Sequence, residues 1–218
     1  MFNSISGDFK LDKGSIILDG IDITKRADYQ RSKYIGRLFQ DPLRGSAPHM
    51  TIKENLALAY MRADKNKKIF SCISKKDEKF FKEELKKLDL NLEDRMDTKV
   101  GLLSGGQRQA LTLLMATLVK PRLLLLDEHT AALDPGTAAV VLSKTEEIIN
   151  KHNLTAFMVT HNMKDALRYG NRLIMMDKGR IVLDISGEEK KKLTVADLLK
   201  MFEKVTGNEI VNDSVLLA

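Results

Sequence analysis

Two patterns of hydrophobic residues alternate along this chain. Short apolar or β-branched runs lie at residues 15–18, 34–39, 123–126 and 155–160, and each predicts a strand. Elsewhere apolar residues recur every three or four positions, which predicts helices. These helices are expected at 51–62, around Phe81, Leu85 and Leu88, and at 107–118, 137–150, 163–169 and 194–205.

The alternation of strands with helices predicts an α/β fold around a parallel sheet. The run at 123–126 is apolar throughout, as is typical of a strand covered on both faces, and 155–160 is interpreted as another buried strand. A hairpin is expected around Asp177-Lys178-Gly179, between strands at 172–176 and 180–183.

The middle of the chain interrupts this alternation. Residues 43 to about 100 are mostly helical and charged, with a lysine-rich loop at 63–76. We expect them to form a helical subdomain inserted into a core of residues 1–42 and about 101–218. The prediction is therefore one domain spanning 1–218.

Composition narrows the class of protein. Of 218 residues, 43% are hydrophobic and 30% charged, as in soluble globular proteins, and no apolar run approaches the ~18 residues of a membrane-spanning helix. The net charge of +6 concentrates in lysine-rich stretches at 65–87 and 190–192, which are read as solvated helix faces or, alternatively, as contacts to nucleic acid or anionic lipid. Aromatic residues make up only 6%, which disfavours a base-stacking surface. A single cysteine excludes an internal disulfide.

Two motifs carry candidate chemistry. Asp127 and Glu128 end the apolar run, and a carboxylate pair at the carboxyl end of a buried strand can divide the work of orienting Mg²⁺ and polarising an attacking water. Taken alone, the pair also fits a solvated acidic turn. The second motif is Leu-Ser-Gly-Gly-Gln at 103–107, at a helix start. Its Ser104 can cap the helix or bond a phosphate, and its two glycines permit close approach of a ligand.

Gln40 and His161 each follow a predicted strand, so both can lie at the sheet edge that also carries Asp127. His161 is well placed there to contact a γ-phosphate, although a lone histidine is more often a surface or core residue.

The order of these motifs resembles the nucleotide-binding domain of ATP-binding cassette (ABC) transporters along the whole chain. The resemblance implies a P-loop NTPase-like core that binds ATP and Mg²⁺. It makes Gln40 the Q-loop glutamine, which contacts Mg²⁺, Asp127 the Walker B aspartate, Glu128 the catalytic base and His161 the switch histidine. Residues 103–107, including Ser104, Gly105, Gly106 and Gln107, would be the signature motif, and Asp134 would belong to the D-loop.

The family also implies partners. Two subunits sandwich ATP head to tail, so a homodimer is expected, bound to an integral membrane permease on the cytoplasmic face of the membrane and served indirectly by a substrate-binding protein. Nucleic acid is not an expected partner. The variant Asp-Glu-His-Thr-Ala-Ala-Leu-Asp-Pro, with Phe39-Gln40-Asp41-Pro42, resembles a bacterial importer group associated with amino acids or other small solutes.

The phosphate-binding loop Gly-x-x-x-x-Gly-Lys-[Ser/Thr] does not occur in this sequence. Phe2 and Ile5 at helical spacing, with Gly7 as a C-terminal cap, indicate that the chain starts inside the helix that follows this loop in the family. We therefore expect a truncated or misannotated reading of a longer chain that lacks the loop and its N-terminal strands, one of which is expected beside residues 123–126. Such a chain should bind ATP weakly or not at all.

Two other functions fit part of the pattern. One is a non-catalytic partner that lends its signature motif to an intact cassette, because the signature and D-loop act in trans. Assays with and without an intact cassette would separate it from a catalytic subunit. The other is a soluble ABC ATPase, which usually has two cassettes or a long coiled-coil insert.

Overall fold

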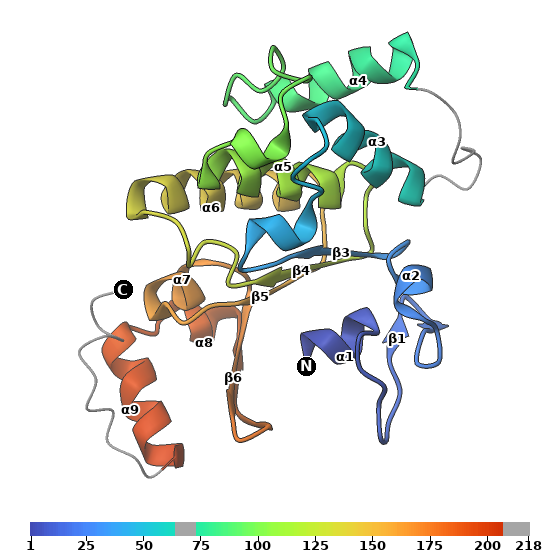
Figure 1. The fold of residues 1–218 in the computed structure, drawn as a ribbon. Helices are drawn as coiled ribbons and strands as arrows, with labels where there is room; N and C mark the ends of the chain where they lie inside the picture. The colour runs from blue at the N-terminus through green and yellow to red at the C-terminus, as the bar shows by residue number, and fades with distance from the viewer. Residues whose placement is uncertain (64–72, 207–218) are drawn as a thin grey trace. The chain divides into compact units, whose positions relative to one another are not determined.

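The computed structural model describes residues 1–63 and 73–206 (Figure 1). The chain divides into two compact units, Met1–Met158 and Val159–Ala218, and each is described by itself. Most of the lysine-rich loop expected at 63–76 lies outside the described residues, and the helix after it already begins at Lys75.

A three-stranded sheet forms the centre of the first unit. Its strands are β3 (Ile35–Leu38), β4 (Leu123–Asp127) and β5 (Ala156–Val159), in the order β3-β4-β5. Strands β3 and β4 run parallel, with Ile35 opposite Leu123 and Leu38 opposite Leu126, so the predicted parallel sheet is confirmed.

Strand β4 has a neighbour on each side. The expectation that the strand of the phosphate-binding loop lies beside residues 123–126 is therefore wrong, because β3 and β5 already occupy both edges of β4. Strand order in a parallel sheet does not follow chain order, and a single sequence does not reveal it.

Helices cover both faces of this sheet. Leu124 and Leu126 pack with Leu113 and Ala116 of α5 (Gly105–Thr117), and α6 (Pro135–His152) lies on the same side (Figure 1). Leu125 points to the opposite face, where α1 (Phe2–Ser6) lies, and is also fully buried. The continuous apolar run of β4 is thus explained by burial on both faces.

Strand β5 is not the buried strand that its sequence predicts. Ala156 is exposed and the other three residues are only half-buried. The physical reason is its position at the end of the sheet order, where it has β4 as its only sheet neighbour in the described structure. Phe157 packs edge-on against Phe2 of α1, with ring centroids 5.3 Å apart.

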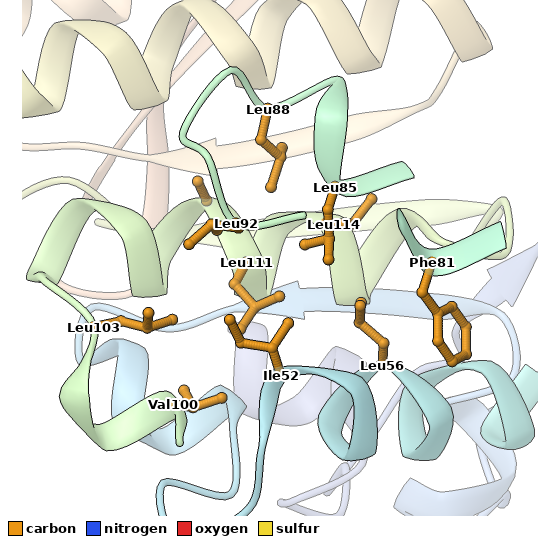
Figure 2. Close-up of a cluster of buried hydrophobic side chains, with 11 residues drawn as sticks. Ile52, Leu56, Phe81, Leu85, Leu88, Leu92, Val100, Leu103, Leu111 and Leu114 are labelled. Atoms are coloured by element: carbon orange, nitrogen blue, oxygen red, sulfur yellow. The ribbon is translucent and has the colours of Figure 1, made fainter. Parts of the chain in front are cut away.

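Residues 43–63 and 73–100 are mostly helical, as expected. They form η1 (Pro42–Gly45), α3 (Ile52–Ala63), α4 (Lys75–Lys86) and η2 (Val100–Leu102), with only an isolated bridge between Thr51 and Lys99 besides. Their apolar side chains join those of α5 in one core (Figure 2). This core comprises Ile52, Leu56, Phe81, Leu85, Leu88, Leu92, Val100, Leu103, Ala110, Leu111 and Leu114.

Helix α5 is buried more extensively than the single apolar stripe predicted for it. Leu111 and Leu114 face the helical core, whereas Leu113 and Ala116 face the sheet. Because α5 lies between these two cores, apolar residues are needed around most of its circumference.

The N-terminal helix α1 is short, yet its C-terminus is well satisfied. Gly7 caps it in the left-handed conformation (φ 100°), as predicted. The buried guanidinium of Arg31 donates to the carbonyls of Ser4 (2.7 Å) and Ile5 (2.9 Å). Arg31 belongs to α2 (Asp28–Arg31), which follows a hairpin of β1 (Ile17–Leu18) and β2 (Ile21–Asp22).

The second unit contains the predicted hairpin. Strands β6 (Arg172–Asp177) and β7 (Arg180–Ser186) pair antiparallel around Lys178 and Gly179 and are longer than expected. Helices α7 (Met163–Arg168) and α9 (Val195–Thr206) fall near their predicted ranges, and α8 (Gly187–Lys191) was not predicted. Within the described ranges of both units, no helix is long and apolar enough to cross a membrane.

Candidate functional site

The register of the central sheet brings three predicted residues to one edge. Leu38 is opposite Leu126, so Gln40 and Glu128 each follow the last paired residue of their strands by two positions. Asp127 is the last residue of β4 and directly precedes Glu128. Parallel strands present their carboxyl ends at the same edge, and α/β proteins bind ligands there.

Glu128 has an unusual backbone conformation. Its φ is +45°, in the left-handed region that non-glycine residues rarely adopt. Such a conformation costs on the order of 1–3 kcal/mol and persists only where the surrounding structure holds it. It turns the chain sharply after β4, so Glu128 does not continue the line of the strand. The sequence signals the acid but not this turn.

His129, which follows Glu128, is a buried residue that the sequence did not single out as functional. Its side chain lies 3.2 Å from Thr145 of α6, measured from Nε2 to Oγ1. The Thr145 hydroxyl already donates to the Val141 carbonyl at 2.8 Å, so His129 must donate to Thr145 from Nε2. Burial lowers the pKa of His129 to about 4, which keeps the ring neutral near pH 7.

Ser104 is a helix cap in this structure. Ser104 Oγ accepts from the Gln107 amide (3.3 Å), and Gln107 Oε1 accepts from the Ser104 amide (3.2 Å). This reciprocal pair is a capping box, so α5 begins at Gly105, two residues before the expected start. Ser104 therefore has the capping role that its sequence allowed.

The signature glycines pack against the start of α6. A Cβ on Gly106 would lie 2.1 Å from Thr137 Cγ2, and one on Gly105 would lie 3.1 Å from Leu133 Cδ2. The absence of a side chain at Gly106 therefore allows the first turns of α5 and α6 to meet.

Asp134 lies at this junction as the N-cap of α6. Its Oδ1 accepts from the Thr137 amide at 3.0 Å. Hydrogen bonds from the Thr137 side chain and amide lower the pKa of Asp134. Residues 104–107 and Asp134 thus lie at two adjacent helix N-termini.

Arg37 is a second residue that the sequence analysis missed. It lies in β3 opposite Leu125, on the face of the sheet that carries α1. Its Nη2 donates to Asp127 Oδ2 (3.0 Å) and to Asn3 Oδ1 (2.7 Å). A basic residue inside an apolar strand was the available signal.

His161 follows β5 in the second unit. It is exposed and lies in the turn between Thr160 and Asn162, where the Asn162 amide donates to Thr160 Oγ1 at 3.0 Å. Asn162 then caps α7 by accepting from the amides of Lys164 and Asp165. The turn fixes the backbone on both sides of His161.

The side-chain oxygen atoms at the ends of β3 and β4 suit a metal ion that is also bound by another molecule. Asp127 supplies a carboxylate and Gln40 an amide oxygen at neighbouring strand ends, and no group of three acidic, histidine or cysteine side chains suited to a metal occurs among the described residues. Mg²⁺ is usually bound through one or two carboxylates together with substrate phosphates and waters. The residues present fit an ion that is bound together with a nucleotide.

Comparison with known proteins shows the family of this chain. The family model described as ABC transporter matches residues 1–131. A tyrosine transport ATP-binding protein of Clostridioides difficile is 46% identical over 203 residues, which cover 93% of this chain and 80% of the relative. A phosphate import ATP-binding protein, PstB, of Aeropyrum pernix is 31% identical over 202 residues, covering 91% of this chain and 75% of the relative.

Solved structures give the same result. An ATP-binding cassette of an ABC transporter in its ADP conformation matches with a TM-score of 0.72 at 27% identity, covering 95% of this chain and 82% of that one. A dimeric cassette in a post-hydrolysis state with ADP and Pi matches with a TM-score of 0.70 at 26% identity, covering 84% and 78%. The chain therefore belongs to the ABC transporter family, as an ATP-binding domain of the transport-coupled ATPase type.

Proposed function

We propose that this chain is the ATP-hydrolysing subunit of an importer for a small solute, with tyrosine or a related amino acid as the first candidate. The observation that supports the proposal is the β3–β4 register in a chain of this family, because Gln40, Asp127 and Glu128 come at the ends of these two neighbouring strands. The 46% identity to a tyrosine transport protein supports the choice of solute.

Glu128 is the proposed catalytic base. A base must lie within hydrogen-bond reach of the attacking water, and the left-handed turn at Glu128 redirects its side chain after the strand ends. Hydrolysis also needs charge neutralisation on the transferred phosphate, which Mg²⁺ supplies when bound. Asp127 and Gln40 are the residues that would hold that ion.

His161 is proposed to contact the γ-phosphate. Its support is its place directly after β5, at the carboxyl end of a strand that belongs to the same sheet as β4. The capped start of α7 after it gives this turn a defined backbone.

The N-terminal ends of α5 and α6 are proposed to act on a second subunit. Ser104, Gly105, Gly106 and Gln107 would bind the ATP held by that subunit, together with Asp134. The close approach of Gly106 to Thr137 supports this, because it brings the N-termini of α5 and α6 together. ATP would close such a homodimer, and hydrolysis would reopen it.

The remaining partners follow from this role. The subunit would bind an integral membrane permease from the cytoplasmic face, and a substrate-binding protein would deliver the solute. Residues 43 to about 100 would form the helical subdomain, with 1–42 and about 101–218 as the core of one cassette domain.

Uptake by proteoliposomes tests this proposal. The transporter, purified with the full-length subunit and its binding protein, should take up labelled tyrosine in an ATP-dependent manner and should not take up labelled phosphate. Uptake of tyrosine that does not require ATP, or ATP-dependent uptake of phosphate instead, would contradict the proposal.

A further inference from the structure

Arg37 donates four hydrogen bonds beside the proposed site. Its Nη1 donates to Ser6 Oγ (2.9 Å) and Asp8 Oδ2 (2.8 Å), while Nη2 donates to Asn3 Oδ1 and Asp127 Oδ2. The Arg37 side chain is 11% exposed. One guanidinium thus joins the N-terminal segment to the end of β4.

The guanidinium is held in place independently of Asp127. Three of its four acceptors lie in or just after α1, and its Cζ lies 4.6 Å from the centre of the Phe39 ring. Such a stacked cation is stabilised by the ring as well as by its hydrogen bonds. Loss of the contact to Asp127 would therefore leave the positive charge where it is.

Asp127 accordingly has a fixed cation as its neighbour. Its Oδ2 is 3.0 Å from Arg37 Nη2, and its side chain is about one-third exposed, so the pair is only partly screened by water. A divalent ion approaching the same carboxylate would be attracted by Asp127 and repelled by Arg37.

We propose that Arg37 is the resident counter-ion of Asp127, and that a divalent cation binds this carboxylate in competition with the guanidinium. The inference rests on the proposed role of Asp127 in metal binding. Arg37 is a positioning residue in this scheme: it sets how strongly the carboxylate attracts a metal and does not itself touch the reacting atoms.

Mn²⁺ alone, in place of Mg²⁺, is the probe for this competition. Free Mn²⁺ is measured by electron paramagnetic resonance during titration of the 218-residue chain. For an ion roughly 6 Å from the guanidinium in a water-like dielectric, Arg37→Met should lower the Kd for Mn²⁺ by about tenfold. Arg37→Gln, which keeps polar atoms near Asn3, should also lower the Kd for Mn²⁺. It serves as the test variant if Arg37→Met does not fold.

Two controls locate the effect. Arg44 also stacks on Phe39, at 5.3 Å, and is exposed, so Arg44→Met should leave the Kd unchanged. When Asp127→Asn is also present, Arg37→Met should no longer lower the Kd for Mn²⁺. Equal affinity of the parent chain and both Arg37 variants would overturn the inference.

The outcomes separate this inference from the function on which it rests. If Asp127→Asn weakens Mn²⁺ binding but the Arg37 variants do not change it, only the role of Arg37 is wrong. If Asp127→Asn changes nothing in either background, Asp127 does not bind the free ion and the inference is overturned, whereas the proposed ATPase, in which the ion binds together with a nucleotide, still stands.

Discussion

His129 donates a hydrogen bond from Nε2 to Thr145 Oγ1, and this bond ties the turn after Glu128 to helix α6. The ring is 2% exposed and neutral, because burial disfavours its charged form. The turn that carries the proposed base is therefore anchored by a group that is sensitive to acid.

Acid should destabilise the chain through His129. The pKa falls from an ordinary 6.5 to about 4 on folding, so between these values the unfolded chain binds a proton that the folded chain does not. The free energy of unfolding is therefore not reduced by His129 above pH 6.5, and it falls by about 3 kcal/mol in total as the pH is lowered to 4. Urea unfolding across this range is the measurement.

Comparison with His129→Gln isolates this contribution from the titration of carboxylates. The variant should lose about 3 kcal/mol less than the parent between pH 6.5 and 4, and His49→Gln at an exposed position is the matched control. Parallel pH profiles for the parent and His129→Gln would show that His129 does not titrate as described.

Gly106→Ala should destabilise the chain through a steric conflict with α6. The new Cβ would meet Thr137 Cγ2 at 2.1 Å, and overpacking of this kind costs about 1–3 kcal/mol. Thr137→Ser removes Cγ2 but keeps the hydroxyl, so the double variant should recover most of the loss. Denaturant unfolding of the four proteins gives the coupling, and additive effects would rule out the predicted contact.

Arg31→Met should loosen α1. The substitution removes donors from the carbonyls of Ser4, Ile5 and two further residues, and a buried hydrogen bond from a charged group contributes about 1.5–3 kcal/mol. We expect a loss of about 3 kcal/mol in unfolding free energy and faster proteolytic cleavage near residue 7. Lys25→Met, at an exposed neighbouring position, should have neither effect; equal cleavage rates for the two variants would contradict this role of Arg31.

The sequence was most informative where local pattern and burial coincide. The apolar run of β4 correctly indicated a strand covered on both faces, and Ser104-Gly105-Gly106 correctly indicated a helix start, although α5 begins two residues earlier than expected. The same reasoning failed for β5, because an edge strand and a central strand can have similar sequences.

Long-range contacts account for what the sequence did not reveal. Arg37 was not singled out, because its four acceptors come from two segments that are distant in the sequence. The close approach of the Gly106 backbone to the Thr137 side chain likewise depends on how α5 and α6 meet, which neither segment encodes alone.

ATP turnover by the transporter, assembled with the full-length subunit, tests the central claim most directly. Glu128→Gln keeps the size of the side chain but removes the base, so turnover should fall by at least about 100-fold while ATP still drives the subunits to dimerise. Glu146→Gln, on the exposed face of α6, is the matched control and should retain full activity. Unchanged turnover in Glu128→Gln would contradict the assignment of Glu128 as the base, and with it the proposed site.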